Sequence, residues 1–398
     1  MILSRADADP SRRGLFVYAF TLGAFFAASA APTPLYRVYQ QLWSISPTGI
    51  TVVFAVYAFS LLAALLTIGS ISDHIGRRPA VALALVLQAI AMVLFILADG
   101  YGWLVGARLL QGFATGAAAS AIGAALVDAD SGQGPIVNSL APLVGMAVGA
   151  LLCGALVEYA PAPAHLVYIL LLALVVAQLA MVARTPETAT RRGGLLASLW
   201  PRVAVPGAAR RMLLLITPIN VALWTLGGFF LSLMPSLIVS ATGSRSTVLA
   251  GAVVAALMLS GAATIQLIRG LPARRVVLTA APIMIAGMLV LVLGVHQGSV
   301  PVLLVGTLGT GIGFGAGFLG CVGSIVPLAA PDERAELLAA FYVESYLAFS
   351  VPAIIAGVLA GQVGLRLTTD IYAAAIILLV VVGCAALMMD GRTRTARA

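Results

Sequence analysis

The amino-acid sequence predicts an all-α polytopic membrane protein with twelve transmembrane helices in two six-helix halves. Three observations lead to this fold class. Of the 398 residues, 61% are hydrophobic and only 9% are charged, whereas a soluble domain carries about 25% charged residues. The apolar residues gather into twelve runs, each long enough or nearly so for the roughly 20 residues that cross a bilayer. A single long polar connection divides these runs six and six.

The twelve expected spans are apolar runs separated by short segments rich in Arg, Asp, Gly and Pro. They cover residues 14–34, 48–68, 79–98, 103–126, 135–157, 165–183, 211–239, 247–268, 275–295, 300–326, 336–359 and 370–389. Two of them, 211–239 and 300–326, are longer than a bilayer requires, so we expect them to tilt or bend. Pro218 is a candidate for a bend in the first of these.

The arginines predict which way the chain crosses the membrane. All 22 basic residues are Arg, and cytoplasmic loops carry an excess of positive charge. With the N-terminus inside, the cytoplasmic segments hold eighteen of them: Arg5, Arg12, Arg13, Arg77, Arg78, Arg184, Arg191, Arg192, Arg202, Arg210, Arg211, Arg269, Arg274, Arg275, Arg334, Arg392, Arg394 and Arg397. The opposite side holds Arg37, Arg245 and Arg366. We therefore expect a multi-pass protein of a bacterial inner membrane, with both termini cytoplasmic.

The long connection predicts the domain organisation. It separates an N-terminal half, residues 1–183, from a C-terminal half, residues 211–398, and residues 184–210 form a cytoplasmic linker. Two related halves are common among transporters. A weak internal echo supports them, since Gly112-Phe113 in the fourth span corresponds to Gly313-Phe314 in the tenth.

The most informative segment is the loop between the second and third spans. It reads Gly69-Ser70-Ile71-Ser72-Asp73-His74-Ile75-Gly76-Arg77-Arg78-Pro79. Its order and spacing of Gly, Asp, Gly, Arg and Arg resemble the signature loop of the major facilitator superfamily, G-x-L-a-D-r-x-G-r-k, with Ile71 for the leucine and His74 for the basic residue. The resemblance is to the twelve-helix drug:proton antiporter type. It implies secondary active transport by alternating access.

The resemblance also implies a conformational latch at this loop. Its expected members are Gly69, Asp73, Gly76, Arg77, Arg78 and Asp128. Asp73 would dock on the positive N-terminus of the span that begins near Ala335 and Glu336 when the cytoplasmic side is closed. Arg77 would pair with Asp128, or with Asp130 in its place. The alternative is that these charges serve topology alone.

Two charged residues within spans are candidates for proton coupling. Arg108, Gln111 and Gly112 resemble a second pattern of the same family, R-x-x-q-G, which implies a role of Arg108 in proton coupling or substrate binding. The alternative is that Arg108 snorkels to the interface. Glu344 is the only acid found deep within a span. A carboxyl group withdrawn from water holds its proton more firmly, so Glu344 is expected to carry protons; the alternative is a permanently protonated acid bonded to a neighbouring helix.

The expected substrate contacts are polar or aromatic residues within spans: Tyr57, Gln111, Asn220, Trp224, Tyr342 and Tyr346. Each is equally consistent with ordinary helix packing. The scarcity of intramembrane acids mildly disfavours a heavily charged substrate. The three cysteines lie far apart in the sequence, so neither a metal site nor a disulfide framework is expected.

The leading functional prediction is proton-coupled efflux of small, largely apolar compounds. The alternative is proton-coupled import of a sugar, a carboxylate or another small nutrient. Family antiporters carry Gly-Pro in the fifth span, where this chain has Gly145-Met146, and that difference keeps the alternative open. An enzyme is not expected, since the histidines fall in separate loops and no P-loop occurs. The expected partners are a small substrate, protons and lipid, without cofactor or nucleic acid, and the chain is expected to work as a monomer.

Overall fold

The computed structural model describes residues 10–189 and 193–395. Every regular element within these ranges is a helix, and twelve helices are long and apolar enough to cross a membrane. The predicted all-α fold with twelve spans is therefore confirmed. Arg5, Arg191, Arg192 and Arg397 lie outside the described residues, as do the two ends of the predicted domain ranges.

The helices follow one another with short connections. The first eight are α1 (Pro10–Ala30), α2 (Pro32–Trp43), α3 (Pro47–Ile68), α4 (Ile71–Ile75), α5 (Arg77–Ile96), α6 (Tyr101–Ala129), α7 (Gly134–Tyr159) and α8 (Pro163–Val182). The others are α9 (Leu195–Ser198), α10 (Gly207–Ser232), α11 (Met234–Thr242), α12 (Thr247–Ile268), α13 (Ala273–Gln297), α14 (Val300–Ile325), the 3₁₀ turn Val326–Leu328, α15 (Arg334–Val363) and α16 (Leu365–Thr395). Helical backbone satisfies its own hydrogen bonds, as a lipid environment requires.

The first spans of both halves differ from their expected ranges. The span predicted at 14–34 begins earlier and is followed directly by α2, which starts at Pro32. The span predicted at 211–239 is divided at Leu233 into α10 and α11. Helix α10 continues through Pro218, so the break falls instead just before Pro235, where proline is tolerated in the first turn of α11.

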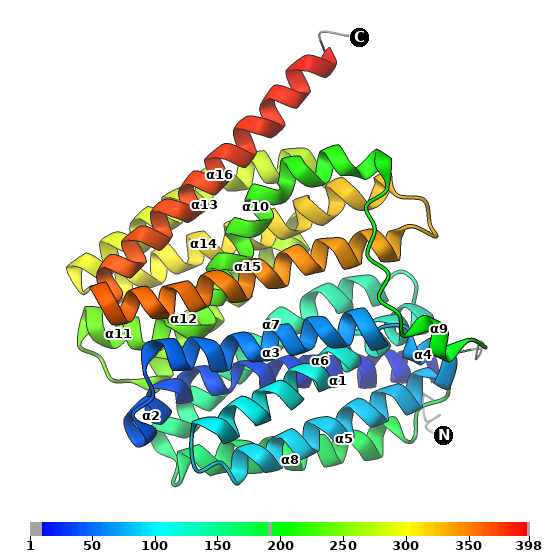
Figure 1. Ribbon diagram of the computed structural model, residues 1–398, viewed down its shortest axis with the longest axis horizontal. Coiled ribbons are helices and arrows are strands. Elements are labelled where there is room, and N and C mark those ends of the chain that lie inside the picture. The colour runs from blue at the N-terminus through cyan, green and yellow to red at the C-terminus, as the bar shows by residue number, and fades with distance from the viewer. Residues whose placement is uncertain (1–9, 190–192, 396–398) are drawn as a thin grey trace, which may run out of the picture.

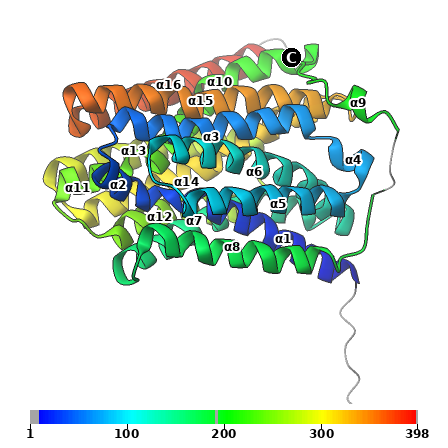
Figure 2. The same ribbon diagram turned by 60° about the horizontal axis from the view of Figure 1, so that its bottom comes forward.

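The helices lie in two layers (Figure 1). Helices α1–α8 form one layer and α10–α16 the other, and the chain crosses between them at the end where α4 and α9 lie. Figure 2 shows α4 and α9 at that same end and α2 and α11 at the opposite end. We call the end with α4 the signature-loop face and the other end the far face. The domain boundaries 1–183, 184–210 and 211–398 stay a prediction.

The two layers touch closely at the far face. Helix α3 packs on α15, and α7 packs on α12. Glycines allow this approach: a Cβ added at Gly357 of α15 would overlap the side chain of Thr51 in α3, and one at Gly154 of α7 would overlap the backbone of Thr247 in α12. Thr51 is the fifth residue of α3 and Thr247 the first of α12, and both helices begin at the far face, so the layers are closed there.

Candidate functional site

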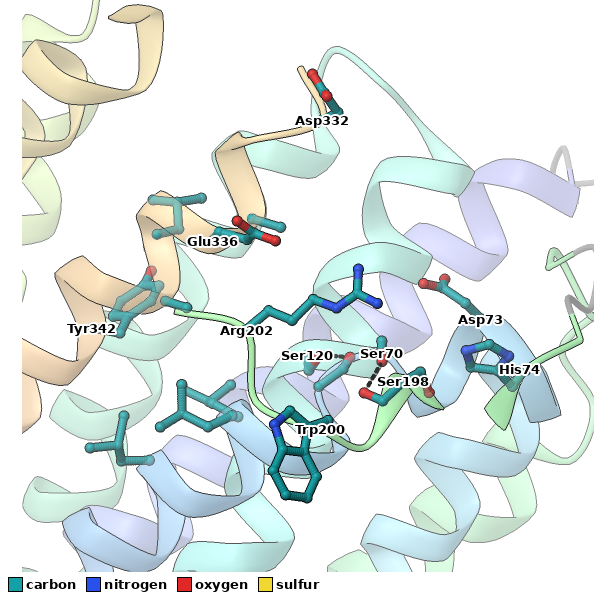
Figure 3. Close-up of a pocket in the computed structure, with 18 of the residues that line it drawn as sticks. Ser70, Asp73, His74, Ser120, Ser198, Trp200, Arg202, Asp332, Glu336 and Tyr342 are labelled. Atoms are coloured by element: carbon teal, nitrogen blue, oxygen red, sulfur yellow. Dashed lines mark hydrogen bonds between the residues drawn. The ribbon is translucent and has the colours of Figure 1, made fainter. Parts of the chain in front are cut away.

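A cavity of about 730 Å³ opens between the layers at the signature-loop face. Its walls come from α3, α4, α6, the linker and α15. The deeper wall is apolar, with Leu62, Leu65, Leu66, Leu338 and Ala339. Charged or polar side chains gather nearer its mouth, and Figure 3 labels Asp73, His74, Arg202, Asp332 and Glu336 among them. Together with the closed far face, this cavity gives the molecule access from one side only.

Aromatic side chains lie beside the inner end of the cavity. Tyr342 lines it, and the ring of Tyr346 lies 6.3 Å from that of Tyr342. Behind them, Trp224 packs on Tyr346 with ring centroids 5.0 Å apart, and Tyr57 belongs to the same apolar cluster. Of the expected substrate contacts, only Tyr342 therefore lines the cavity in this conformation. The indole Nε1 of Trp224 is buried and has no hydrogen-bond partner among the residues that the structure describes.

Arg108 is buried rather than snorkelling, with 1% of its surface exposed. Its Nη1 donates to the carbonyl oxygen of Ser29, at 3.0 Å, and to Oε1 of Gln111, at 2.7 Å. The guanidinium carbon lies 4.3 Å from the ring centroid of Tyr57, a cation–π contact. Nε has no partner, and no ion pair of Arg108 occurs within the described residues. The site thus holds a permanent positive charge that no carboxylate balances directly.

Gln111 anchors this arrangement to α1. Its Nε2 donates to the carbonyl oxygen of Ala28 at 3.0 Å, while its Oε1 accepts the hydrogen bond from Nη1 of Arg108. Gly112, the next residue of the motif, lets α6 approach α3 because a Cβ there would overlap the backbone of Tyr57. The sequence motif therefore corresponds to one packed unit of α1, α3 and α6.

Glu344 lies between α15 and α10 in a polar cluster. Its Oε2 accepts a hydrogen bond from Thr217 Oγ1, and its Oε1 accepts one from Asn220 Nδ2, both at 3.0 Å. Asn220 Nδ2 also donates to Ser345 Oγ at 3.0 Å. Two residues predicted separately, Glu344 and Asn220, are thus direct partners.

Glu344 does not line the cavity. At 3.6 residues per turn, two residues turn a helix by about 200°, so Glu344 faces away from Tyr342 on α15. Asn220 bonds both Glu344 and Ser345, and the residue after Ser345 is Tyr346, whose ring lies 6.3 Å from that of the cavity-lining Tyr342.

The signature loop is organised around Arg77, at the start of α5. Its Nε donates to Oδ2 of Asp128 at 2.9 Å, and its Nη1 donates to Ser72 Oγ at 2.7 Å and pairs with Asp73. The expected Arg77–Asp128 contact is present, and it ties α4 and α5 to the end of α6. The side chain of Arg78, one residue further, is exposed.

The glycines of the loop have separate structural roles. Gly76 has φ of +107°, which strongly favours glycine. Gly69 receives a hydrogen bond from Ser120 of α6 on its carbonyl oxygen, and a Cβ at Gly69 would overlap the carbonyl of Leu65. Both positions therefore need glycine for backbone reasons.

The Asp73 carboxylate and the N-terminal turn of α15 lie on opposite walls of the cavity (Figure 3). The docking expected between them is not made in this conformation, in which the signature-loop face is open. The latch role of Asp73 stays a prediction for the closed conformation.

Glu187, in the linker, is a site residue that sequence reasoning missed. Its carboxylate accepts hydrogen bonds from the backbone amides of Arg77, at 2.8 Å, and Arg78, at 3.1 Å, and so caps α5. Burial raises the pKa of Glu187, but these amides and those of Ala189 and Thr188 outweigh it and hold the pKa below its usual value. The sequence signal is the acid in Thr185-Pro186-Glu187, directly after the sixth span.

The linker makes further contacts with the first layer. Thr188 Oγ1 donates to Asp128 at 3.3 Å, and Ser70 Oγ donates to the carbonyl oxygen of Ser198 in α9 at 3.2 Å. The linker is therefore attached to the signature loop before it turns to α10. Within the described ranges, no three His, Cys, Asp or Glu side chains gather as metal ligands would.

Comparison with known proteins gives a family and a fold. A model of the Major Facilitator Superfamily matches residues 15–271. The crystal structure of the human organic anion transporter MFSD10 (TETRAN) superposes with a TM-score of 0.69 at 19% identity, over 94% of this chain and 100% of that one. A bacterial homolog of the human lysosomal transporter Spinster, inward-facing and unoccupied, superposes with a TM-score of 0.74 at 14% identity, over 96% and 98%. No curated protein sequence matches the chain.

Proposed function

The chain belongs to the Major Facilitator Superfamily, and on that premise we propose that it exports small, largely apolar compounds in exchange for protons. The observation that supports transport most directly is the cavity of about 730 Å³, open at one face while the other is closed. Alternating access requires states that are open at one face and closed at the other, and this arrangement fits such a state. The leucines along α3 and α15 and the aromatic rings beside Tyr342 suit a molecule with a mainly apolar body.

The arginine distribution supports the orientation of this proposal. The excess of arginine on that side favours a cytoplasmic signature-loop face in a bacterial inner membrane, and the cavity in the present conformation would then receive its cargo from inside the cell. Closure of the signature-loop face and opening of the far face would then release the cargo outside. We propose that one chain suffices, since a single copy contains both layers and the cavity.

Glu344 is the proposed proton carrier, because it is an acid inside a span with two neutral hydrogen-bond donors. Protonation would remove negative charge from an acceptor shared by Thr217 and Asn220, which weakens both bonds. Both donors belong to α10 and Glu344 belongs to α15, so this changes the packing of two helices beside Tyr346. Arg108 would tune that equilibrium as a fixed charge, or would contact the cargo.

The experiment compares Glu344→Gln with Glu336→Gln in everted membrane vesicles. Glu336 is an acid of the same helix at the cavity mouth. Comparison of the two variants therefore distinguishes the loss of the proposed proton carrier from the general effect of removing a carboxylate from α15. We expect proton release on addition of cargo, read with a pH-sensitive dye, to disappear in Glu344→Gln while the protein is still folded and inserted. Proton exchange equal to wild type in Glu344→Gln would remove Glu344 from the mechanism.

Import of a sugar, carboxylate or other small nutrient is the second candidate, favoured by Met146 in place of the proline expected after Gly145. A panel of fluorescent drugs and labelled nutrients, given to cells without their own pumps, separates the two directions. Lower drug accumulation with the wild type, abolished by a protonophore, supports export. Higher accumulation of one nutrient supports import and overturns the first proposal.

A further inference from the structure

A carboxylate of α7 caps the N-terminus of α12 at the far face. Oε2 of Glu158 accepts a hydrogen bond from Ser246 Oγ at 2.6 Å and one from the backbone amide of Val248 at 3.0 Å. Ser246 is itself the N-cap of α12, since its hydroxyl oxygen accepts from the amide of Leu249 at 3.2 Å. Glu158 and Ser246 together therefore satisfy amides of the first turn of α12, which would otherwise lack a partner.

The neighbouring contacts show that Glu158 belongs to the surface where the two layers meet. One turn earlier on α7, the carbonyl oxygen of Gly154 accepts a hydrogen bond from Thr247 Oγ1 at 2.8 Å. A Cβ at Gly154 would overlap the backbone of Thr247, and one at Gly251 would overlap that of Ala150. The cap can thus exist only while α7 and α12 are in close contact.

We propose that Glu158 is the latch of the far face. Its carboxylate is held by the N-terminus of α12, where the helix dipole favours negative charge, and this contact stabilises the conformation with the far face closed. When the far face opens, α12 moves away from α7 and the carboxylate returns to water. The inference rests on the proposed alternating access, but on neither the identity of the cargo nor the role of protons.

The proposal assigns opposite roles to two carboxylates of the first layer. Glu158 is bound to a helix N-terminus of the second layer in the present conformation, whereas Asp73 is separated from the N-terminus of α15 by the open cavity. Each would be engaged when the other is released. Loss of either charge therefore shifts the same equilibrium in opposite directions, which a merely structural role of Glu158 does not predict.

The test measures the distance across the far face in purified protein in lipid nanodiscs. Spin labels are placed at His165→Cys, at the start of α8, and Gln362→Cys, at the end of α15, after replacement of the three native cysteines. Both positions are exposed and lie in different layers. Double electron–electron resonance then gives the ratio of far-open to far-closed molecules without any cargo.

We expect Glu158→Gln to raise that ratio roughly two- to five-fold, the range for a charge at an exposed helix N-terminus. Ser246→Ala should shift it in the same direction, and Asp73→Asn should lower it. Asp99→Asn is the matched control, since Asp99 is an exposed acid of the same face whose side chain has no partner in the described parts of the chain.

The proposal is overturned if Glu158→Gln and Asp99→Asn give the same distance distribution, or if Glu158→Gln shifts it toward the closed state. Because the distance measurement needs neither cargo nor a proton gradient, its result does not depend on the proposed cargo or on the proposed proton coupling. Absence of export from cells together with the expected shift would refute the cargo assignment and leave the latch supported.

Discussion

Replacement of Arg77 by alanine should destabilise the protein far more than the same change at Arg78. Arg77 joins three elements through Asp73, Ser72 and Asp128, and its side chain is only 12% exposed. Arg78 has the same charge one residue further, with its side chain exposed. The pair therefore compares, at one helix terminus, an arginine whose side chain forms ion pairs with one whose side chain forms none with the described residues.

The magnitude follows from the contacts. Hydrogen bonds that involve charged groups contribute about 1.5–3 kcal/mol each, so the two carboxylate contacts of Arg77 would add up to about 3–6 kcal/mol if they were buried. The side chains of Asp73 and Asp128 are 40% and 32% exposed, and water replaces part of what they lose, which brings the expected cost to about 2 kcal/mol. This equals roughly a 30-fold change in the unfolding equilibrium constant. Arg78→Ala should stay within about 0.5 kcal/mol of wild type.

The assay is unfolding of the detergent-solubilised protein by increasing fractions of sodium dodecyl sulfate, followed by tryptophan fluorescence. Arg77→Lys should lie between the two alanine variants, because an ammonium keeps the charge but not the planar fork of donors. Equal unfolding midpoints for Arg77→Ala and Arg78→Ala would refute the reasoning, since they would show that the ordered contacts of Arg77 add nothing to stability.

Two further predictions concern the linker and the packing of α6. Glu187→Gln should cost about 1 kcal/mol at neutral pH, as loss of a helix cap does. Because the pKa of Glu187 is lower in the folded state, its contribution to the free energy of unfolding is complete above the ordinary carboxyl pKa of 4.5 and disappears as the pH falls through the lowered pKa. The unfolding midpoints of wild type and variant should therefore converge in acid. A difference between the midpoints that persists in acid contradicts the assignment. Gly112→Ala should destabilise the protein by about 1–3 kcal/mol, because the added Cβ overlaps the Tyr57 backbone. Gly106→Ala, in the same helix but with open space around it, should be neutral or stabilising. Equal effects of the two variants in the same unfolding assay would argue against close α3–α6 packing.

Length and hydropathy were sufficient to predict the twelve spans, because a membrane helix must satisfy its backbone internally and keep an apolar surface. The same information did not locate the breaks at Ala31 and Leu233. Apolar residues continue across both breaks, and only the prolines that follow mark them. Pro218, equally visible in the sequence, lies within a continuous helix, so proline alone does not identify where a helix ends.

The site was predictable where its contacts are local or belong to a motif. The Arg77–Asp128 pair belongs to the latch that the motif resemblance implies, with Asp130 as the alternative, and the structure contains the Asp128 contact. The cap by Glu187 joins residues 110 apart in sequence, and no local pattern reports such a contact. Burial of Arg108 depends on how α6 packs on α1 and α3. The orientation of Glu344 away from Tyr342, in contrast, follows from helix periodicity and was accessible from the sequence.

The attachment of α9 to Ser70 determines the length of linker that is free to connect the two layers. The linker is hydrogen-bonded to the first layer at Ser198, and α10 begins at Gly207, so the eight residues 199–206 connect that point to the second layer. Fully extended, these residues reach roughly 28 Å. Trp200 and Arg202 belong to this segment, residues 199–206, and also line the cavity. Any rotation of one layer relative to the other must therefore move these two cavity-lining side chains. The set of residues that surrounds the cavity entrance would then change with the conformation of the protein.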